Sequence, residues 1–140
     1  MYLVDTNVVS ELRRRAHAAE PTVRKWAMSV PPESQFLSGV TIGEIEEGVL
    51  RKERDDPRQG AVLRQWLENV ILREFADRIL PVDADVARRM AQFGIARTRQ
   101  MPDAYIGATA AVHGLILVTR NTKDFGDLGI GLLNPWQYGG

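Results

Sequence analysis

The sequence contains no cysteine, which excludes disulfide bonds, thiol catalysis and thiolate metal sites. It has only two histidines, so a histidine-rich zinc site is not expected. The formal net charge is +0, and any binding of nucleic acid must therefore rest on a local basic patch. No apolar run is long enough to span a bilayer, and the first residues lack the basic and apolar regions of a signal peptide. We therefore expect a cytoplasmic protein without a membrane segment.

The composition is that of an ordinary globular protein. Hydrophobic residues make up 44% of the 140 residues and charged residues 26%. This length suits one domain with a core of its own, and no repeat or linker interrupts it. We expect a single domain over residues 1–140.

Apolar runs bounded by polar residues alternate with segments of helical spacing. The runs predict strands at Met1–Val4, Gln35–Val40, Ile79–Val82, Leu115–Thr119 and Gly131–Asn134. The segments predict helices at Val8–Arg15, Pro21–Val30, Thr41–Lys52, Arg58–Ala76, Ala84–Thr98 and from Pro102 to His113. In the long fourth helix one apolar stripe is expected to face the core, formed by Val62, Trp66, Leu67, Val70 and Ile71. This alternation predicts an α/β fold with a mostly parallel sheet covered on both faces.

Four acidic residues fall near the predicted ends of strands. Asp5 follows the first strand, and Glu44 falls in the first turn of the helix after the second strand. Asp103 begins the helix before the fourth strand, and Asp124 comes just after that strand. Ligands of open α/β sheets bind outside the carboxyl ends of the strands. If the first, second and fourth strands are neighbours, these acids share one edge of the sheet.

Carboxylates that gather at one edge need a compensating charge. Two unit charges about 4 Å apart repel by roughly 4 kcal/mol at an effective dielectric of 20. A divalent cation removes that cost, and Mg²⁺ and Mn²⁺ prefer oxygen ligands. Such an ion also activates water and stabilises charge on a phosphate, which permits phosphodiester hydrolysis.

Each acid also has a purely structural interpretation. Asp5 is a suitable N-cap of the first helix. Thr41 and Glu44 have the spacing of a capping box, which is compatible with a second role for Glu44. Asp103 suits the dipole of its helix, and Asp124 suits a solvated turn. Only their joint placement at one edge favours a metal site.

Four motifs follow one another along the chain: Met1–Asn7, Thr41–Ile45, Pro102–Ala110 and Val118–Phe125. In this order they resemble those of PIN-domain proteins, and most closely the VapC-type toxins of bacterial toxin–antitoxin pairs, including their FitB-like branch. The terminal Asn134-Pro135-Trp136 is similar to that branch as well. The resemblance covers essentially the whole chain.

The resemblance implies a three-layer α/β/α sandwich and a Mg²⁺- or Mn²⁺-dependent endoribonuclease. It implies inhibition by a small, cognate VapB-like antitoxin, a homodimer and a larger toxin–antitoxin complex on operator DNA. The first three acids of the family correspond to Asp5, Glu44 and Asp103. The fourth position is filled by either Asn121, through its amide oxygen or a water molecule, or Asp124.

Further residues are expected to support this site. Thr6, Asn7 and Thr119 would orient the carboxylates. Trp26, Trp66 and Trp136 are expected to pack rather than to stack on bases. The basic residues near the presumed edge either hold substrate phosphates or form a solvated charged face. These residues are Arg13, Arg14, Arg15, Arg120 and Lys123.

Other functions use a similar fold. An aspartyl-phosphate phosphatase requires a second Asp two residues after the first, where this chain has Asn7. A receiver domain requires an adjacent acidic pair after its first strand, whereas Asp5 stands alone. An inactive module that holds an antitoxin helix in a groove, as part of a DNA-bound repressor complex, is the remaining alternative.

Overall fold

A computed structural model of the protein describes residues 1–14 and 18–140. In these residues five strands form one sheet in the order β3-β2-β1-β4-β5, and every neighbouring pair is parallel. The strands are β1 (Tyr2–Val4), β2 (Gln35–Ser38), β3 (Ile79–Leu80), β4 (Ile116–Val118) and β5 (Leu132–Leu133). All five lie within the predicted apolar runs, and the predicted neighbours β2, β1 and β4 are adjacent. Arg15, one of the predicted phosphate-binding residues, lies outside the described part of the chain.

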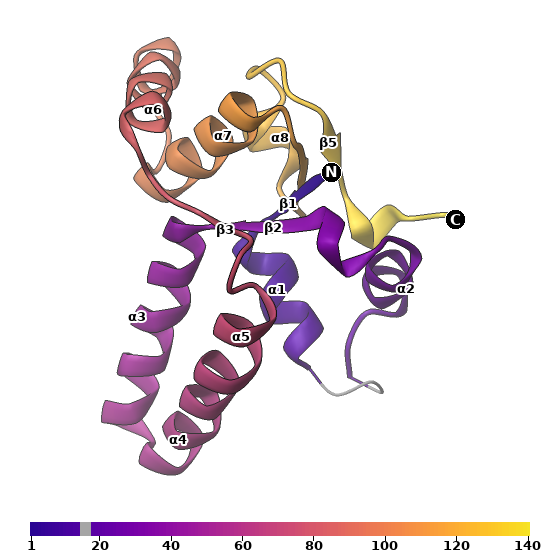
Figure 1. Ribbon diagram of the computed structural model, residues 1–140, viewed down its shortest axis with the longest axis vertical. Helices are drawn as coiled ribbons and strands as arrows, with labels where there is room; N and C mark the ends of the chain where they lie inside the picture. Colours follow the sequence, from indigo (N-terminus) through magenta and orange to yellow (C-terminus); the bar gives the residue numbers. More distant parts are fainter. Residues whose placement is uncertain (15–17) are drawn as a thin grey trace.

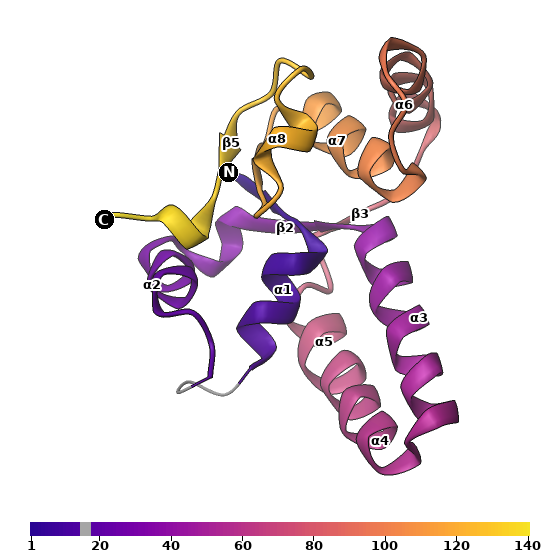
Figure 2. The ribbon, with the colours of Figure 1, turned by 180° about the vertical axis from the view of Figure 1, so that it is seen from behind.

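Helices cover both faces of the sheet, which confirms the predicted three-layer α/β/α arrangement (Figures 1 and 2). One layer contains α6 (Ala84–Ala96), α7 (Met101–His113) and α8 (Thr122–Phe125). The other layer contains α1 (Thr6–Arg13), α2 (Pro21–Ser29), α3 (Gly39–Asp55), α4 (Pro57–Trp66), a π-helical turn (Leu67–Ile71) and α5 (Leu72–Glu74). Short 3₁₀ turns at Pro32–Ser34 and Pro135–Gln137 complete the fold. None of the helices in the described residues is both long and apolar enough to cross a membrane.

Alternate residues of the strands fill two separate cores. Leu3 and Leu117 pack with Ile106 of α7 on one face of the sheet. Val4 and Val118 pack with the helices of the opposite face. Because successive side chains of a strand point to opposite faces, a central strand buried on both sides is apolar throughout. This explains why the strands appear in the sequence as short continuous apolar runs.

Helix α3 begins earlier than the capping-box pattern predicts. The side chain of Ser38 accepts a hydrogen bond from the backbone N–H of Val40 at 3.0 Å, so Ser38 is the N-cap. Thr41 is therefore a buried residue inside the helix, and Glu44 lies in the second turn rather than the first. The predicted capping box at Thr41 and Glu44 is wrong. Glu44 does not cap this helix, and its carboxylate accepts a hydrogen bond from the hydroxyl of Thr6 instead.

The predicted long helix between residues 58 and 76 is interrupted, and part of its predicted apolar stripe is wrong. Leu67 and Ile71 are buried, but Val62 and Val70 are 55% and 51% exposed. The face of α4 that meets α3 runs through Gly60, where an added Cβ would lie 2.4 Å from the Cα of Glu53. The π-helical turn then adds a residue to the helix and shifts the buried face once more. A single 3.6-residue periodicity therefore does not describe both α4 and the segment from the π-helical turn onward.

Candidate active site

The site lies where the strand order changes direction. From β1 the chain proceeds to β2 and β3 on one side of the sheet, and then to β4 and β5 on the other. Connections that leave adjacent strands in opposite directions open a crevice at their carboxyl ends. Asp5 directly follows β1 and Thr119 directly follows β4. The hydroxyl of Thr119 donates a hydrogen bond of 2.8 Å to Oδ2 of Asp5 across this point.

Asp5 is a buried carboxylate held by neutral donors. Asp5 is only 5% exposed. Oδ1 accepts from the backbone N–H of Thr6 at 2.7 Å, so Asp5 also caps α1 as the sequence allowed. Burial raises the pKa of Asp5 to about 6, and the charges of Asp103 and Glu44 add to this effect, while the hydrogen bonds from Thr119 and Thr6 oppose it. A bound cation would restore the charged form.

Glu44 reaches the same place from α3. Oε1 of Glu44 accepts a hydrogen bond of 2.6 Å from the hydroxyl of Thr6, which lies 3.1 Å from the hydroxyl of Thr41. These contacts join the first turn of α1 to the second turn of α3. They place the Glu44 carboxylate close enough to Asp5 to repel its charge.

Asp103 enters from the other layer, in the first turn of α7. Burial raises its pKa, and the charges of Asp124 and Glu44 raise it further, whereas the charge of Arg99 opposes the shift. Helix α7 approaches the side chain of Leu128 closely because Gly107 has no Cβ. An added Cβ at this position would lie 2.6 Å from that side chain. Gly107 therefore serves the packing of this helix.

The carboxylates form an open group rather than a closed cage. Within residues 1–14 and 18–140 there is no cluster of three or more acidic, histidine or cysteine side chains arranged to hold an ion by themselves. Mg²⁺ is commonly bound through one or two carboxylates and keeps several water molecules. The donor set suits such an ion, because its members are hard oxygen ligands and Asp5 is buried without a cationic partner among its hydrogen-bond donors.

The two candidates for the fourth position lie in or beside α8. Asp124 is exposed within this helix, and its Oδ1 lies 3.7 Å from Nη2 of Arg97. Asn121 precedes the helix and is also exposed. Its backbone N–H donates to the hydroxyl of Thr119 at 3.1 Å. The charge of Asp124 raises the pKa of Asp103, while Asn121 is connected to the site through its hydrogen bond to Thr119.

Sequence reasoning missed Arg99, which organises the segment around Asp124. Its side chain is only 3% exposed and forms a salt bridge of 2.6 Å with Asp127. The same guanidinium donates to the backbone carbonyls of Phe93 and Asp124, each at 3.1 Å. Arg99 thus joins the end of α6 to α8 from a position four residues before Asp103. The only signal in the sequence is an arginine close to Asp103, which is too common to single out.

The predicted supporting residues surround Asp5. Nδ2 of Asn7 lies 3.4 Å from Oδ2 of Asp5 and 3.5 Å from the hydroxyl of Thr119. Oδ1 of Asn7 accepts from the backbone N–H of Arg120 at 3.4 Å. The side chains after β1 and β4 therefore form one hydrogen-bonded group at the edge of the sheet.

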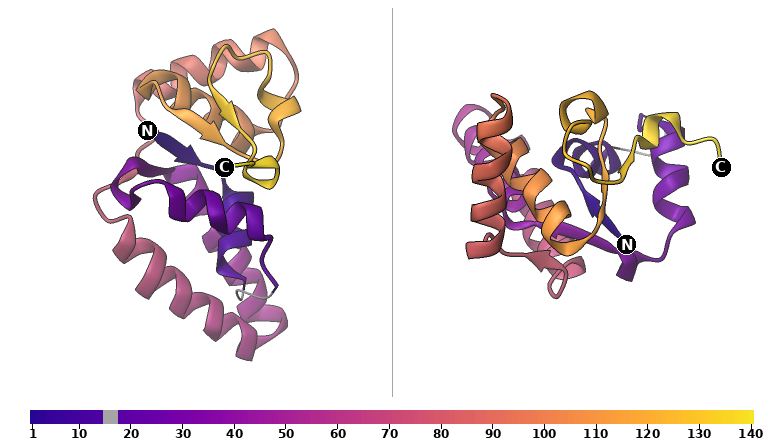
Figure 3. Two further views of the ribbon diagram at one scale, coloured as in Figure 1. Left: turned by 90° about the vertical axis from the view of Figure 1, so that its right-hand side faces the viewer. Right: turned by 90° about the horizontal axis from the view of Figure 1, so that it is seen from above.

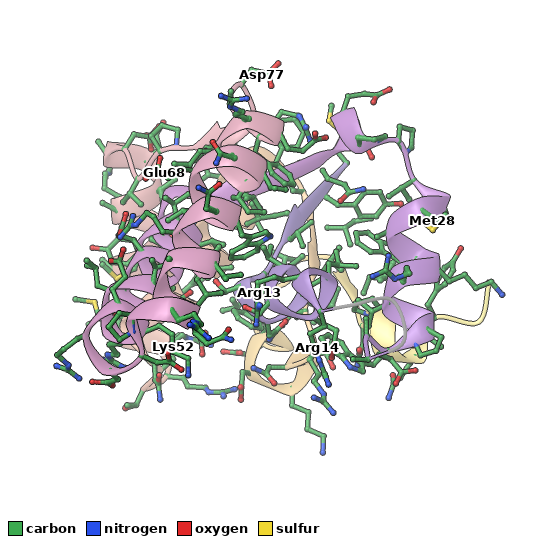
Figure 4. All side chains as sticks on the ribbon, turned by 90° about the horizontal axis from the view of Figure 1, so that it is seen from below. Arg13, Arg14, Met28, Lys52, Glu68 and Asp77 are labelled. Carbon is green, nitrogen blue, oxygen red and sulfur yellow. The ribbon has the colours of Figure 1, made fainter. Side chains whose placement is uncertain are left out.

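Basic side chains flank this group, several of them engaged with other residues. The guanidinium of Arg13 lies 5.8 Å from the ring centre of Trp66, and that of Arg120 lies 4.9 Å from the ring centre of Trp136. Arg14 forms a salt bridge of 3.2 Å with Glu11. Figure 4 shows Arg13, Arg14 and Lys52 on the face of the molecule that is seen from below.

The tryptophans differ in their burial. Trp26 is fully buried and meets the ring of Tyr2 edge-on, with 5.5 Å between ring centres, so its predicted packing role is confirmed. Trp66 and Trp136 are only partly buried against the same core. Both carry an arginine on the ring, a contact that the sequence did not predict.

The parallel sheet and the acidic crevice at its carboxyl ends define an open α/β protein with a candidate ligand site at the switch point of the strand order. A receiver domain is excluded by topology, because its strand order is 2-1-3-4-5 and this sheet has the order 3-2-1-4-5. The chain belongs to the PIN domain family, which matches residues 2–130. The resemblance inferred from the four motifs is thereby confirmed.

Individual relatives match over nearly their full length. The chain is 38% identical to Toxin FitB of Neisseria gonorrhoeae and 34% identical to VapC ribonuclease Y4jK of Sinorhizobium fredii. Each match covers 98% of this chain and 99% of the relative. The fold is also similar to the solved structure of FitAB bound to the IR36 DNA fragment. In that comparison the TM-score is 0.86 and the identity 34%, over 98% of this chain and 96% of the other.

Proposed function

We propose that this protein is a divalent-metal-dependent endoribonuclease and the toxin of a toxin–antitoxin pair, acting as one domain over residues 1–140. The observation that carries the proposal is the buried carboxylate of Asp5 at the adjacent carboxyl ends of β1 and β4. Its pKa is raised to about 6, and the charges of Asp103 and Glu44 contribute to this shift. The ribonuclease and toxin relatives support the same activity.

Asp5 and Asp103 are the carboxylates that would hold Mg²⁺ or Mn²⁺, directly or through water. They approach from opposite layers of the fold and both have raised pKa values. When bound, the ion supplies positive charge that stabilises the phosphate and activates water. Asp124 is placed to hold a water molecule or a second ion, with Asn121 as the alternative donor.

The remaining side chains orient these groups. Thr119 and Asn7 direct Oδ2 of Asp5, and the backbone N–H of Thr6 directs Oδ1. The hydroxyl of Thr6 engages Oε1 of Glu44, which leaves Oε2 to accept a proton from the attacking water. Hydrogen-bonded carboxylates lose less freedom when the substrate binds, and this preorganisation favours the reaction.

The substrate is RNA, held by its phosphates. Arg13, Arg14 and Arg120 are exposed cations that line a cavity with Asn7, and Lys123 is an exposed cation of α8. Because the whole chain has no net charge, such a local basic group is the feature that would bind a polyanion. The predicted role of Arg15 remains a prediction.

As a toxin, the protein would be held inactive by a small VapB-like antitoxin and would assemble with it on operator DNA. The FitAB complex on DNA supports this assembly. We also propose a homodimer and a cytoplasmic location, where RNA and antitoxin are both found. The alternative of an inactive binding module is not favoured, because the ribonuclease and toxin relatives support an active enzyme.

The proposal is tested by expressing wild type, Asp5→Ala and Asp103→Asn without a partner, and by incubating each purified protein with RNA and Mn²⁺. We expect the wild type to arrest growth and to cut RNA, and both variants to be tolerated and inactive. Asp85→Asn removes an exposed acid of α6 as a control and should behave as wild type. Equal tolerance of wild type and Asp5→Ala, with intact RNA in both, would refute the proposal.

A further inference from the structure

The guanidinium of Arg120 and the ring of Trp136 form a stacked pair beside the acidic crevice. The guanidinium carbon lies 4.9 Å from the centre of the ring. Arg120 is exposed, and within the described residues its side chain enters no salt bridge. The guanidinium therefore lies over the ring and has no ionic partner in the described part of the chain.

Hydrogen bonds hold this pair at a fixed place relative to Asp5. The backbone N–H of Arg120 donates to Asn7, whose Nδ2 in turn lies 3.4 Å from Oδ2 of Asp5. Nδ2 of Asn134 lies 3.5 Å from the carbonyl of Arg120, and Oδ1 of Asn134 accepts from the backbone N–H of Trp136 at 2.9 Å. A short chain of polar contacts thus leads from the acid to the stacked pair.

Helix α2 anchors the backbone of Trp136, and the partly buried ring packs against the core. The hydroxyl of Thr22 donates to the carbonyl of Trp136 at 3.1 Å, and the C-terminal turn lies beside α2 (Figure 3). A platform for a ligand needs such anchoring, because a ring that is already fixed loses little freedom when another plane stacks on it.

An open cavity of about 380 Å³ adjoins the pair and extends along α1. Asn7 and Trp136 form part of its lining, together with the guanidinium groups of Arg13, Arg14 and Arg120. The lining also includes the carboxylate of Glu11, which Arg14 already neutralises at 3.2 Å. Positive charge is thus in excess here, in a chain whose formal net charge is +0.

We propose that this cavity is a nucleotide subsite for single-stranded RNA, next to the position of the cleaved phosphate. The base stacks on the outer face of the Arg120 guanidinium, extending the Trp136 stack, and the neighbouring phosphate binds Arg13 and Arg14. Single-stranded RNA is recognised in this way, by stacking of unpaired bases on aromatic rings and guanidinium planes. The inference rests on the proposed ribonuclease function and adds a substrate contact to it.

Binding to a fluorescein-labelled single-stranded RNA of about twelve nucleotides, measured by anisotropy in EDTA so that no cleavage occurs, tests the subsite. Arg120→Lys keeps the charge but removes the plane. We expect Arg120→Lys and Arg120→Ala to weaken binding by about tenfold. In Arg120→Lys the slope of log Kd against log salt should stay that of wild type, because the number of phosphate contacts is unchanged.

Two further variants locate the effect. Arg73→Ala removes an exposed cation of α5, before β3 and so at the opposite edge of the sheet, and should bind RNA as wild type. Arg13→Ala should reduce the salt slope by about one unit. Thermal denaturation of each variant shows whether its fold is retained.

The inference is wrong if Arg120→Lys binds this RNA with wild-type affinity, because charge alone then suffices. It is also wrong if Arg120→Ala weakens binding of the antitoxin but not of RNA, because the cavity is then a protein contact. A wild type that neither binds nor cuts RNA would instead overturn the proposed function. A wild type that cuts RNA while Arg120→Ala binds and cuts equally well would overturn only the subsite.

Discussion

The hydroxyl of Thr119 at the end of β4 donates a 2.8 Å hydrogen bond to the carboxylate of Asp5 at the end of β1. Both residues are buried, and the bond lowers the pKa of Asp5 against the effect of burial. Thr119→Val keeps the shape of the side chain and removes the donor. We expect it to weaken Mn²⁺ binding by about tenfold or more, as measured by calorimetry. Mn²⁺ affinity equal to that of wild type would show that Thr119 only fills space.

Removing the charge of Asp103 should abolish the response to metal without harming the apo protein. An ion that binds only the folded state at about 100 times its dissociation constant adds roughly 2.7 kcal/mol of stability. We expect Mn²⁺ to raise the Tm of wild type but not of Asp103→Asn. The raised pKa of Asp103 means that its charge is unfavourable in the fold, so apo Asp103→Asn should be no less stable. An apo variant that melts far below wild type would indicate a structural role.

The pH dependence of stability should report the buried charge of Asp5. Its pKa is about 6 in the folded protein, against an ordinary value of 3.8. The folded state therefore binds this proton more tightly, and the resulting stability is present below about pH 4 and is lost as the pH rises through about 6. In metal-free urea denaturation, we expect Asp5→Asn to gain up to about 3 kcal/mol on wild type between those limits. A difference that does not change with pH would contradict this assignment.

Asp124→Asn should separate the two candidates for the fourth position. The charge of Asp124 raises the pKa of Asp103, so its removal should lower that pKa, measured by NMR titration of the apo protein. We also expect RNA cleavage to fall by about tenfold with no change in Tm, because Asp124 is exposed. Asn121→Ala is the companion variant. Cleavage that is lost in Asn121→Ala and retained in Asp124→Asn would assign the position to Asn121.

The two arginines that precede Asp103 should differ in their importance for folding. The side chain of Arg99 is 3% exposed and donates to two backbone carbonyls, whereas the side chain of Arg97 is 42% exposed. Arg99→Ala removes the hydrogen bonds to both carbonyls and the salt bridge to Asp127, and it should lower the Tm by about 4 °C or more. Arg97→Ala should change it little. Thermal denaturation of both variants in EDTA compares them, and equal losses would mean that burial does not distinguish them.

The sheet and its acidic edge were predictable because both depend on local patterns. Each strand is a short apolar run, and the residue after a central strand necessarily lies at the sheet edge, which placed Asp5 near Thr119. The start of α3 was not predictable in the same way. Ser38 and Thr41 are both good N-caps, and Gly39 and Val40 are poor helix formers, so local propensity favoured the later start. The structure uses the earlier one.

Contacts between distant segments account for what the sequence did not reveal. The exposure of Val62 and Val70 follows from the close crossing of α3 and α4 at Gly60 and from the π-helical turn. Arg99 forms a salt bridge with Asp127, and the guanidinium of Arg120 lies over the ring of Trp136. The sequence gives no indication that these pairs are in contact. Such contacts exist only after the layers have packed.

The bond between Thr119 and Asp5 has a consequence for protein synthesis. Asp5 leaves the ribosome among the first residues, but its partner is made more than one hundred residues later, and the strand that carries this partner pairs directly with β1. A growing chain therefore cannot assemble the acidic crevice until most of it has been translated.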